Sequence, residues 1–214
     1  MASLPDYSKT KQMFHTLPLD AFLEATATKE PVPGGGGIAA MTAASAAALV
    51  EMVANLTVGK KGYEEVGPIM LGIRDRAGQL RQRYLRGIDD DANAFAQVIQ
   101  AVRLPKDTPH RTELVQQAFK DAATIPFALG KDIFTILQLA EQTVRYGNAW
   151  VITDGAIAAM NARAAMRSAF YSVRINLKSI TDSEFTKSMM ASILEIEAKA
   201  ALVEAQVENE YAHR

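Results

Sequence analysis

The sequence predicts an all-α protein that folds as a single bundle of about six or more helices. The chain contains 36 Ala, against 13 Gly and 8 Pro among its 214 residues, and Ala is the strongest helix former. Apolar residues recur at helical spacing, whereas no stretch sustains the alternation of a β-strand. Hydrophobic residues make up 49% of the chain. That share excludes a mainly disordered protein and supplies a sizeable core.

The predicted elements begin with a loose N-terminal arm over residues 1–17, followed by a short helix from near Pro18. The run Pro31–Gly37 is the strongest helix breaker in the chain. The next helix, residues 38 to about 58, carries mostly small side chains, so neighbouring helices can approach it closely. It is expected to be central.

Three further regions have helical periodicity before the last helix. The first, about 64–102, has an expected weak point at Gly87. The second, about 110–145, contains Pro126, which is expected to kink or divide it. The third, 148–178, is rich in Ala. The last helix is predicted over residues 183–210. No linker interrupts this series, so residues 1–214 form one domain.

Composition excludes several classes of function. The 23 Lys and Arg against 24 Asp and Glu give a net charge of −1, which disfavours nucleic-acid binding. The absence of Cys excludes disulfides, thiolate nucleophiles and thiolate metal sites. The three His are far apart in the sequence, so we expect no metal.

Targeting signals are also missing from the sequence. The N-terminus lacks the pattern of a secretory signal. The longest apolar stretch, Ile38–Val50, has 13 residues, against about 20 for a membrane span. We therefore expect a cytoplasmic protein with no membrane partner.

Asp91 is the clearest candidate for chemistry. It lies three residues after Ile88 and four before Phe95, so on a continuous helix it points the way the core residues point. A carboxylate in that position must be paired, hydrogen-bonded or protonated, and a raised pKa suits a general acid or base. The alternative is that Asp91 caps a helix that restarts after Gly87.

Other polar features are weaker signals. The Gly34–Gly37 run before a helix could cradle an anion, although most such runs are turns. Lys60 and Lys61 lie between two glycines and beside Tyr63, although most lysines in such places are only solvated. In the 148–178 helix one stripe is basic and the opposite one holds Asp154 and other polar residues. From the pattern alone, a solvated basic face is the favoured explanation. The basic residues are Arg163, Arg167, Arg174 and Lys178.

Several segments together resemble the cyclodeaminase/cyclohydrolase family of folate enzymes. In chain order they are EPVPGGGGIAA (30–40), MVANLTVGKKGY (52–63), DDDANAF (89–95), LPKDTP (104–109), GNAWVITDGAIAA (147–159) and INLKSITD (175–182). They span nearly the whole chain. The resemblance implies a cyclodeaminase-like helical bundle and a homodimer.

The resemblance also implies roles for individual residues. The essential acid falls on Asp91, and the cations of the folate site fall on Lys60 and Lys61. The substrate-binding positions that follow from it, together with two cations expected along the anionic folate tail, are Gly34, Gly35, Gly36, Gly37, Asn55, Tyr63, Asp154, Lys106 and Arg163.

The expected reaction is hydrolysis of 5,10-methenyltetrahydrofolate to 10-formyltetrahydrofolate, with Asp91 transferring a proton and a lysine tuning its pKa. The substrate is a tetrahydrofolate derivative, with or without a polyglutamate tail, and no tightly bound cofactor is expected. The GGGG and GKKGY motifs favour this over the alternative, formiminotetrahydrofolate cyclodeaminase.

Two readings of other classes stay open. One is a non-enzymatic helical dimerisation module, in which Asp91, Lys60 and Asp154 are scattered over the surface. The enzyme reading expects all three in one cleft, within a subunit or at a subunit boundary. A metal-dependent hydrolase is the weaker rival, because the His residues do not cluster.

Overall fold

The structure is a computed structural model that describes residues 13–214, so most of the predicted N-terminal arm lies outside it. The described chain is helical, with no strand in residues 13–214. A short 3₁₀ turn, η1 (Phe14–Thr16), leads into helix α1 (Leu19–Thr26). Pro18 immediately precedes α1, as the sequence predicts.

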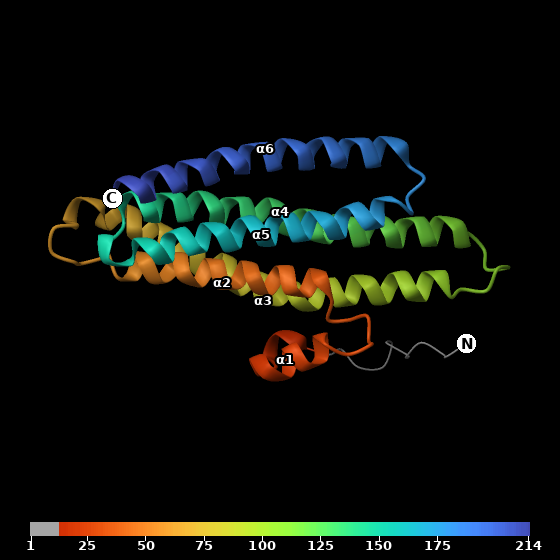
Figure 1. Ribbon diagram of the computed structural model, residues 1–214. Coiled ribbons are helices and arrows are strands. Elements are labelled where there is room, and N and C mark those ends of the chain that lie inside the picture. The colour runs from red at the N-terminus through yellow and green to blue at the C-terminus, as the bar shows by residue number, and fades with distance from the viewer. Residues whose placement is uncertain (1–12) are drawn as a thin grey trace.

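Five long helices form the bundle (Figure 1). They are α2 (Gly35–Asn55), α3 (Gly67–Val102), α4 (Arg111–Tyr146), α5 (Ile152–Leu177) and α6 (Ser183–His213). Helix α2 contacts α3, α4 and α5, so it lies at the centre as predicted. Helix α6 covers α4 and α5 on one side, while α1 lies below α2 and α3 on the other (Figure 1).

Helix α2 begins three residues earlier than predicted, inside the glycine run. The N–H of Ile38 donates to the carbonyl of Gly34 and closes the first helical turn. Glycine is needed at position 36, because a side chain there would overlap Asp91 of α3, whereas a methyl group at Gly37 would make an ordinary contact with Ile88. The run is thus a close helix–helix crossing rather than only a loop.

Helices α3 and α4 are each continuous, which corrects two expectations. Helix α3 passes through Gly87 without a break, so Asp91 is in a helix interior and is not an N-cap. Helix α4 passes through Pro126, so the proline does not divide it. The last helix begins as predicted, with the side chain of Asp182 accepting a hydrogen bond from the Phe185 N–H.

By length and composition alone, α2 and α4 are apolar enough to cross a membrane, which the sequence analysis did not expect. In α2, 56% of the relevant window is buried inside the protein, and in α4 the share is 39%. Both helices supply residues to the main core. Core packing therefore accounts for much of their apolar character.

Candidate active site

Asp91 lies where α3 crosses the first turn of α2. Its carboxylate occupies the space that a side chain at Gly36 would fill. Because burial removes water from the carboxylate, it raises the Asp91 pKa to about 6, while a hydrogen bond from the Gly37 backbone N–H acts in the opposite direction. A carboxyl group of this kind can both accept and return a proton near neutral pH.

Two cavities meet at Asp91. The larger, of about 280 Å³, lies between the glycine run, α3, α4 and α5. Besides Asp91 it is lined by Pro31, Val32, Gly34, Gly35, Gly36, Ala94, Phe95, Val98, Phe119, Ala122, Ser172, Ile175 and Asn176. We call it the glycine-side cavity. It is apolar except at Asp91, the glycine backbone and two polar residues of α5.

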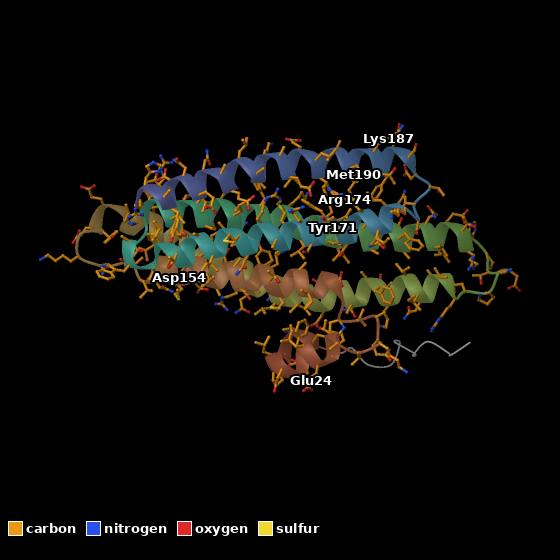
Figure 2. All side chains as sticks on the ribbon, viewed as in Figure 1. Glu24, Asp154, Tyr171, Arg174, Lys187 and Met190 are labelled. Atoms are coloured by element: carbon orange, nitrogen blue, oxygen red, sulfur yellow. The ribbon has the colours of Figure 1, made fainter. Side chains whose placement is uncertain are left out.

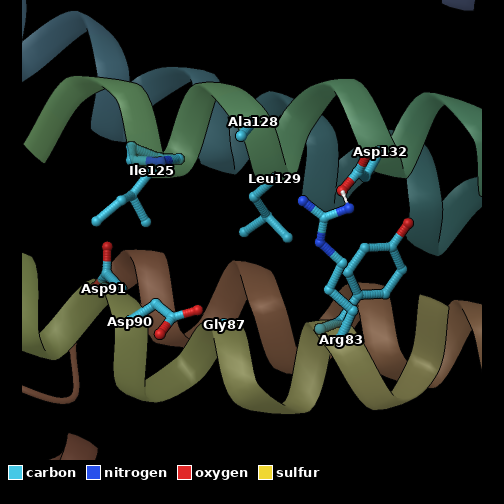
Figure 3. Close-up of a pocket in the computed structure, with 10 residues that line it drawn as sticks. Arg83, Gly87, Asp90, Asp91, Ile125, Ala128, Leu129 and Asp132 are labelled. Carbon is cyan, nitrogen blue, oxygen red and sulfur yellow. Dashed lines mark ion pairs between the residues drawn. The ribbon is translucent and has the colours of Figure 1, made fainter. Parts of the chain in front are cut away.

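The second cavity, of about 200 Å³, lies between α3 and α4. Figure 3 shows the Asp91 side chain of α3 directed toward Ile125 of α4, with Asp90 beside it. At the far end of this cavity, Arg83 and Asp132 form an ion pair of 2.8 Å. Asp91 therefore separates an apolar cavity from a charged one.

Five of the remaining predicted residues belong to the other end of α2 and the segments beside it. The loop after α2 contains Gly59 and Gly62, which adopt positive φ angles of 71° and 89°, a region that favours glycine. Lys60 and Lys61 lie between them, half-buried and exposed respectively. Neither lysine forms an ion pair within residues 13–214, so both ammonium groups are available to an anionic ligand.

Hydrogen bonds fix this loop to the start of α5. The Asn148 N–H donates to the Thr57 hydroxyl, and the Asn148 side chain donates to the Leu56 carbonyl. The Ala149 N–H donates to the Tyr63 hydroxyl at 3.0 Å. Asn55 ends α2 and is exposed, and Asp154 lies in the first turn of α5. We call Asn55, Lys60, Lys61, Tyr63 and Asp154 the lysine-loop cluster.

One chain does not bring the two parts of the predicted site together. Gly36, against Asp91, starts α2, and Asn55 of the lysine-loop cluster ends it. At 1.5 Å per residue, the 21 residues of α2 span about 30 Å. Within one subunit Lys60 and Lys61 are therefore too far from Asp91 to tune its pKa, which burial raises instead.

Arg163 and Lys106 lie away from both parts. The Arg163 guanidinium packs between α5 and α6 and pairs with Glu204 at 3.2 Å, which corrects the expectation that it serves the substrate. A second member of the basic stripe, Arg174, pairs with Glu197 at 2.7 Å, whereas Arg167 and Lys178 are exposed. Two of the four basic residues therefore serve helix packing. Lys106 is exposed in the loop after α3, and its role stays a prediction.

Asn176 was not predicted as a site residue, but it lines the glycine-side cavity together with Ser172. The sequence pattern could have indicated it, because Asn176 follows Ser172 by four residues on the polar stripe that includes Asp154.

Within residues 13–214, no three His, Asp or Glu side chains lie together in a way that could hold a metal ion.

The chain belongs to the family whose model is described as formiminotransferase-cyclodeaminase, which matches residues 18–195. Named members of this family are folate one-carbon enzymes. The chain is 35% identical to methenyltetrahydrofolate cyclohydrolase of Methylorubrum extorquens, over 88% of this chain and 93% of that protein.

Two further relatives are named as cyclodeaminases. The chain is 34% identical to formimidoyltransferase-cyclodeaminase of Gallus gallus over 92% of its own length, but spans only 38% of that protein. The crystal structure of formiminotetrahydrofolate cyclodeaminase from Thermotoga maritima superposes with a TM-score of 0.86 at 31% identity, covering 92% of this chain and 97% of that one. The predicted family and all-α fold are confirmed.

Proposed function

We propose that the protein hydrolyses 5,10-methenyltetrahydrofolate to 10-formyltetrahydrofolate, reversibly, with Asp91 as the general acid and base. The observation that carries this proposal is the Asp91 carboxyl, whose pKa of about 6 results from burial at the mouth of an apolar cavity. A match that covers 93% of a relative named as this cyclohydrolase supports the choice of substrate.

The ionised Asp91 would accept a proton from a water molecule as the water oxygen attacks the carbon between N5 and N10 of the folate. Asp91 would then return the proton to N5 as the bond from N5 to that carbon breaks. The adduct hydroxyl loses its proton to solvent, which leaves a formyl group on N10. Positioned acid–base groups typically contribute about 10²–10⁴-fold to such steps.

We further propose that a complete site forms across a homodimer. Each cavity at Asp91 is at or below the lower end of the roughly 300–1,000 Å³ range of small-molecule sites. Asp91 and the lysine-loop cluster lie at opposite ends of α2, so only a second copy in reversed orientation joins them. The lysines would then hold the anionic part of the folate.

The outward face of α5 suits such a contact because most of its exposed residues are uncharged. They are Trp150, just before the helix, and Thr153, Ile157, Met160, Ala164, Tyr171 and Ile175, with Arg167 as the charged member of the face. Figure 2 shows Asp154 near one end of α5 and Tyr171 toward the other. A two-fold axis in the plane of this face, perpendicular to α5 at Ala164, would bring Asp154 level with Arg174 of the partner subunit.

A second candidate is formiminotetrahydrofolate cyclodeaminase, in which N10 attacks the formimino carbon on N5 and ammonia leaves. The close match to the Thermotoga maritima cyclodeaminase favours it. The same Asp91 would protonate the leaving nitrogen. In either case we propose a cytoplasmic enzyme without a tightly bound cofactor.

One pair of assays separates the two activities. The protein is mixed with methenyltetrahydrofolate and, separately, with formiminotetrahydrofolate, and the absorbance of the methenyl chromophore is followed. Loss of absorbance in the first mixture, faster than in buffer, supports the cyclohydrolase. A gain in the second supports the cyclodeaminase. No change beyond the buffer rate in either mixture would overturn both assignments.

A further inference from the structure

Pro126 leaves a backbone carbonyl of α4 without its usual partner. In an α-helix the N–H of residue 126 would donate to the carbonyl of Ala122, but proline has no N–H. The side-chain amide of Asn176, on α5, fills that vacancy by donating to the Ala122 carbonyl at 2.9 Å. The same nitrogen donates to the Ser172 carbonyl, also at 2.9 Å.

These two hydrogen bonds fix which way the Asn176 amide faces. An amide nitrogen has two N–H donors, and both are used on backbone carbonyls. The flipped amide would place its oxygen against two carbonyl oxygens, which repel it. The side-chain oxygen, Oδ1, therefore faces away from both carbonyls.

Asn176 lines the glycine-side cavity, and because both N–H groups of its amide are used on backbone carbonyls, the oxygen is the polar side-chain atom left for a ligand there. Within residues 13–214 no donor bonds to it, and it is not among the buried atoms that lack a partner, which are the Tyr84 hydroxyl and one Arg163 nitrogen. It is thus a hydrogen-bond acceptor of fixed direction, available to a ligand.

Asp91 and Asn176 line the cavity from two different helices. Asp91 belongs to α3 and Asn176 to α5, and both helices pack against α2 and α4. Phe95, Phe119 and the aliphatic residues Val32, Val98 and Ile175 supply apolar walls. Aromatic walls with one polar group at each side suit a flat heterocycle that carries a hydrogen-bond donor away from its reacting atom.

We infer that Asn176 is a substrate-binding residue whose side-chain oxygen accepts a hydrogen bond from the 2-amino group of the pterin. The inference rests on the proposed function, which supplies the pterin. The 2-amino group lies on the pyrimidine ring, remote from N5 and N10, so a pterin bound in this way directs its reacting carbon toward Asp91.

The test compares two ligands on two proteins. The dissociation constants of 5-formyltetrahydrofolate and of its analogue with a methyl group in place of the 2-amino group are measured by calorimetry. We expect wild-type protein to bind the amino compound about tenfold more tightly, as the gain of one hydrogen bond implies. In Asn176→Ala we expect that preference to fall below about threefold.

Asn176→Ala also leaves the Ala122 carbonyl without a donor, so a second variant separates structure from binding. In the double variant Pro126→Ala/Asn176→Ala, the backbone N–H of residue 126 can serve that carbonyl. We expect the double variant to recover thermal stability but not the preference for the 2-amino group. Pro126→Ala alone should keep the preference.

The outcomes distinguish this inference from the proposed function. Retention of the wild-type preference in Asn176→Ala, or its recovery in the double variant, would show that Asn176 has only a structural role. If wild-type protein binds neither folate, the proposed function fails instead. Asn209→Ala, an exposed asparagine of α6, is the matched control and should behave as wild type.

Discussion

The carboxylate of Asp91 lies against the Cα atom of Gly36, so that α3 and the first turn of α2 share one small volume. This contact explains both the burial of the carboxylate and the need for glycine. Its neighbour Gly37 donates the backbone hydrogen bond that acts on the Asp91 pKa. Glycine run and acid are therefore parts of one local structure.

Substitution Gly36→Ala is expected to displace the Asp91 carboxylate, because the added methyl group would overlap it. We expect kcat to fall at least about 100-fold, within the range that misplacing one acid–base group produces. Steady-state kinetics and the Tm measure the effect. Gly72→Ala is the control, since an added methyl there meets nothing within 4 Å. Wild-type kcat in Gly36→Ala would contradict this account.

The rate is expected to follow the ionisation of Asp91. Its pKa of about 6 means that the carboxylate, the form that accepts a proton, is lost as the pH falls through 6. We expect kcat/KM to decline about tenfold per pH unit below that point. The profile is measured from pH 5 to 8. The residual rate of Asp91→Asn should lack the inflection, and its presence there would assign it to another group.

The thermal stability should also depend on the ionisation of Asp91. Folding favours the protonated acid, whereas the reaction needs the carboxylate. The folded-state pKa of Asp91 lies above the ordinary value of 3.8, so folding favours the protonated acid. The cost of the buried charge is present above pH 6 and disappears as the pH falls. Asp91→Asn should therefore have a higher Tm than wild type at pH 8, with a smaller difference at pH 5.

A site shared between subunits predicts complementation. In a heterodimer of Asp91→Asn with Lys60→Ala/Lys61→Ala, one site has both defects and the other has neither. Heterodimers purified through two different affinity tags should therefore show about half of wild-type activity. Homodimers of each parent from the same cells should be inactive. An inactive heterodimer would place each site within one chain.

The proposed contact between the α5 helices of two subunits can be disrupted at the centre of the helix. Ala164 is exposed at the middle of this face, so Ala164→Arg would place two further positive charges against each other across the two-fold axis. We expect a monomer by light scattering, unchanged helical circular dichroism and loss of activity. Ala201→Arg, at an exposed alanine of α6, should stay dimeric. An active monomeric Ala164→Arg protein would refute the shared site.

The buried hydroxyl of Tyr84 gives a prediction about stability. It has no hydrogen-bond partner within residues 13–214, and burial followed by the nearby charge of Asp132 raises its pKa. Since an unpaired buried hydroxyl costs about 1–3 kcal/mol, Tyr84→Phe should raise the free energy of unfolding by about 1 kcal/mol. Urea denaturation tests this. Tyr211→Phe, at a partly exposed position, should have no effect.

Helical periodicity predicted the bundle and the inward direction of Asp91, because both depend on residues a few positions apart. The continuity of α3 at Gly87 and of α4 at Pro126 could not be predicted, since packing overrides local preference there. At Pro126, the Ala122 carbonyl that lacks a helical donor accepts a hydrogen bond from Asn176, which is 54 residues away in the sequence.

The separation of Asp91 from Lys60 also lay beyond the sequence. Both residues fall in segments that resemble one family, but the sequence does not give the distance between them. The length of α2 sets that distance. The pairing of Arg163 could not be predicted for a similar reason. Its partner Glu204 lies 41 residues later in the chain, on α6.

The placement of Asp91 and the lysine loop at opposite ends of α2 has a consequence for how such an enzyme behaves in dilute solution. A lone subunit would hold two incomplete halves and would be catalytically silent. Specific activity would then depend on protein concentration, and turnover in the cell would be governed by how much of the chain is made as well as by how much folate is present.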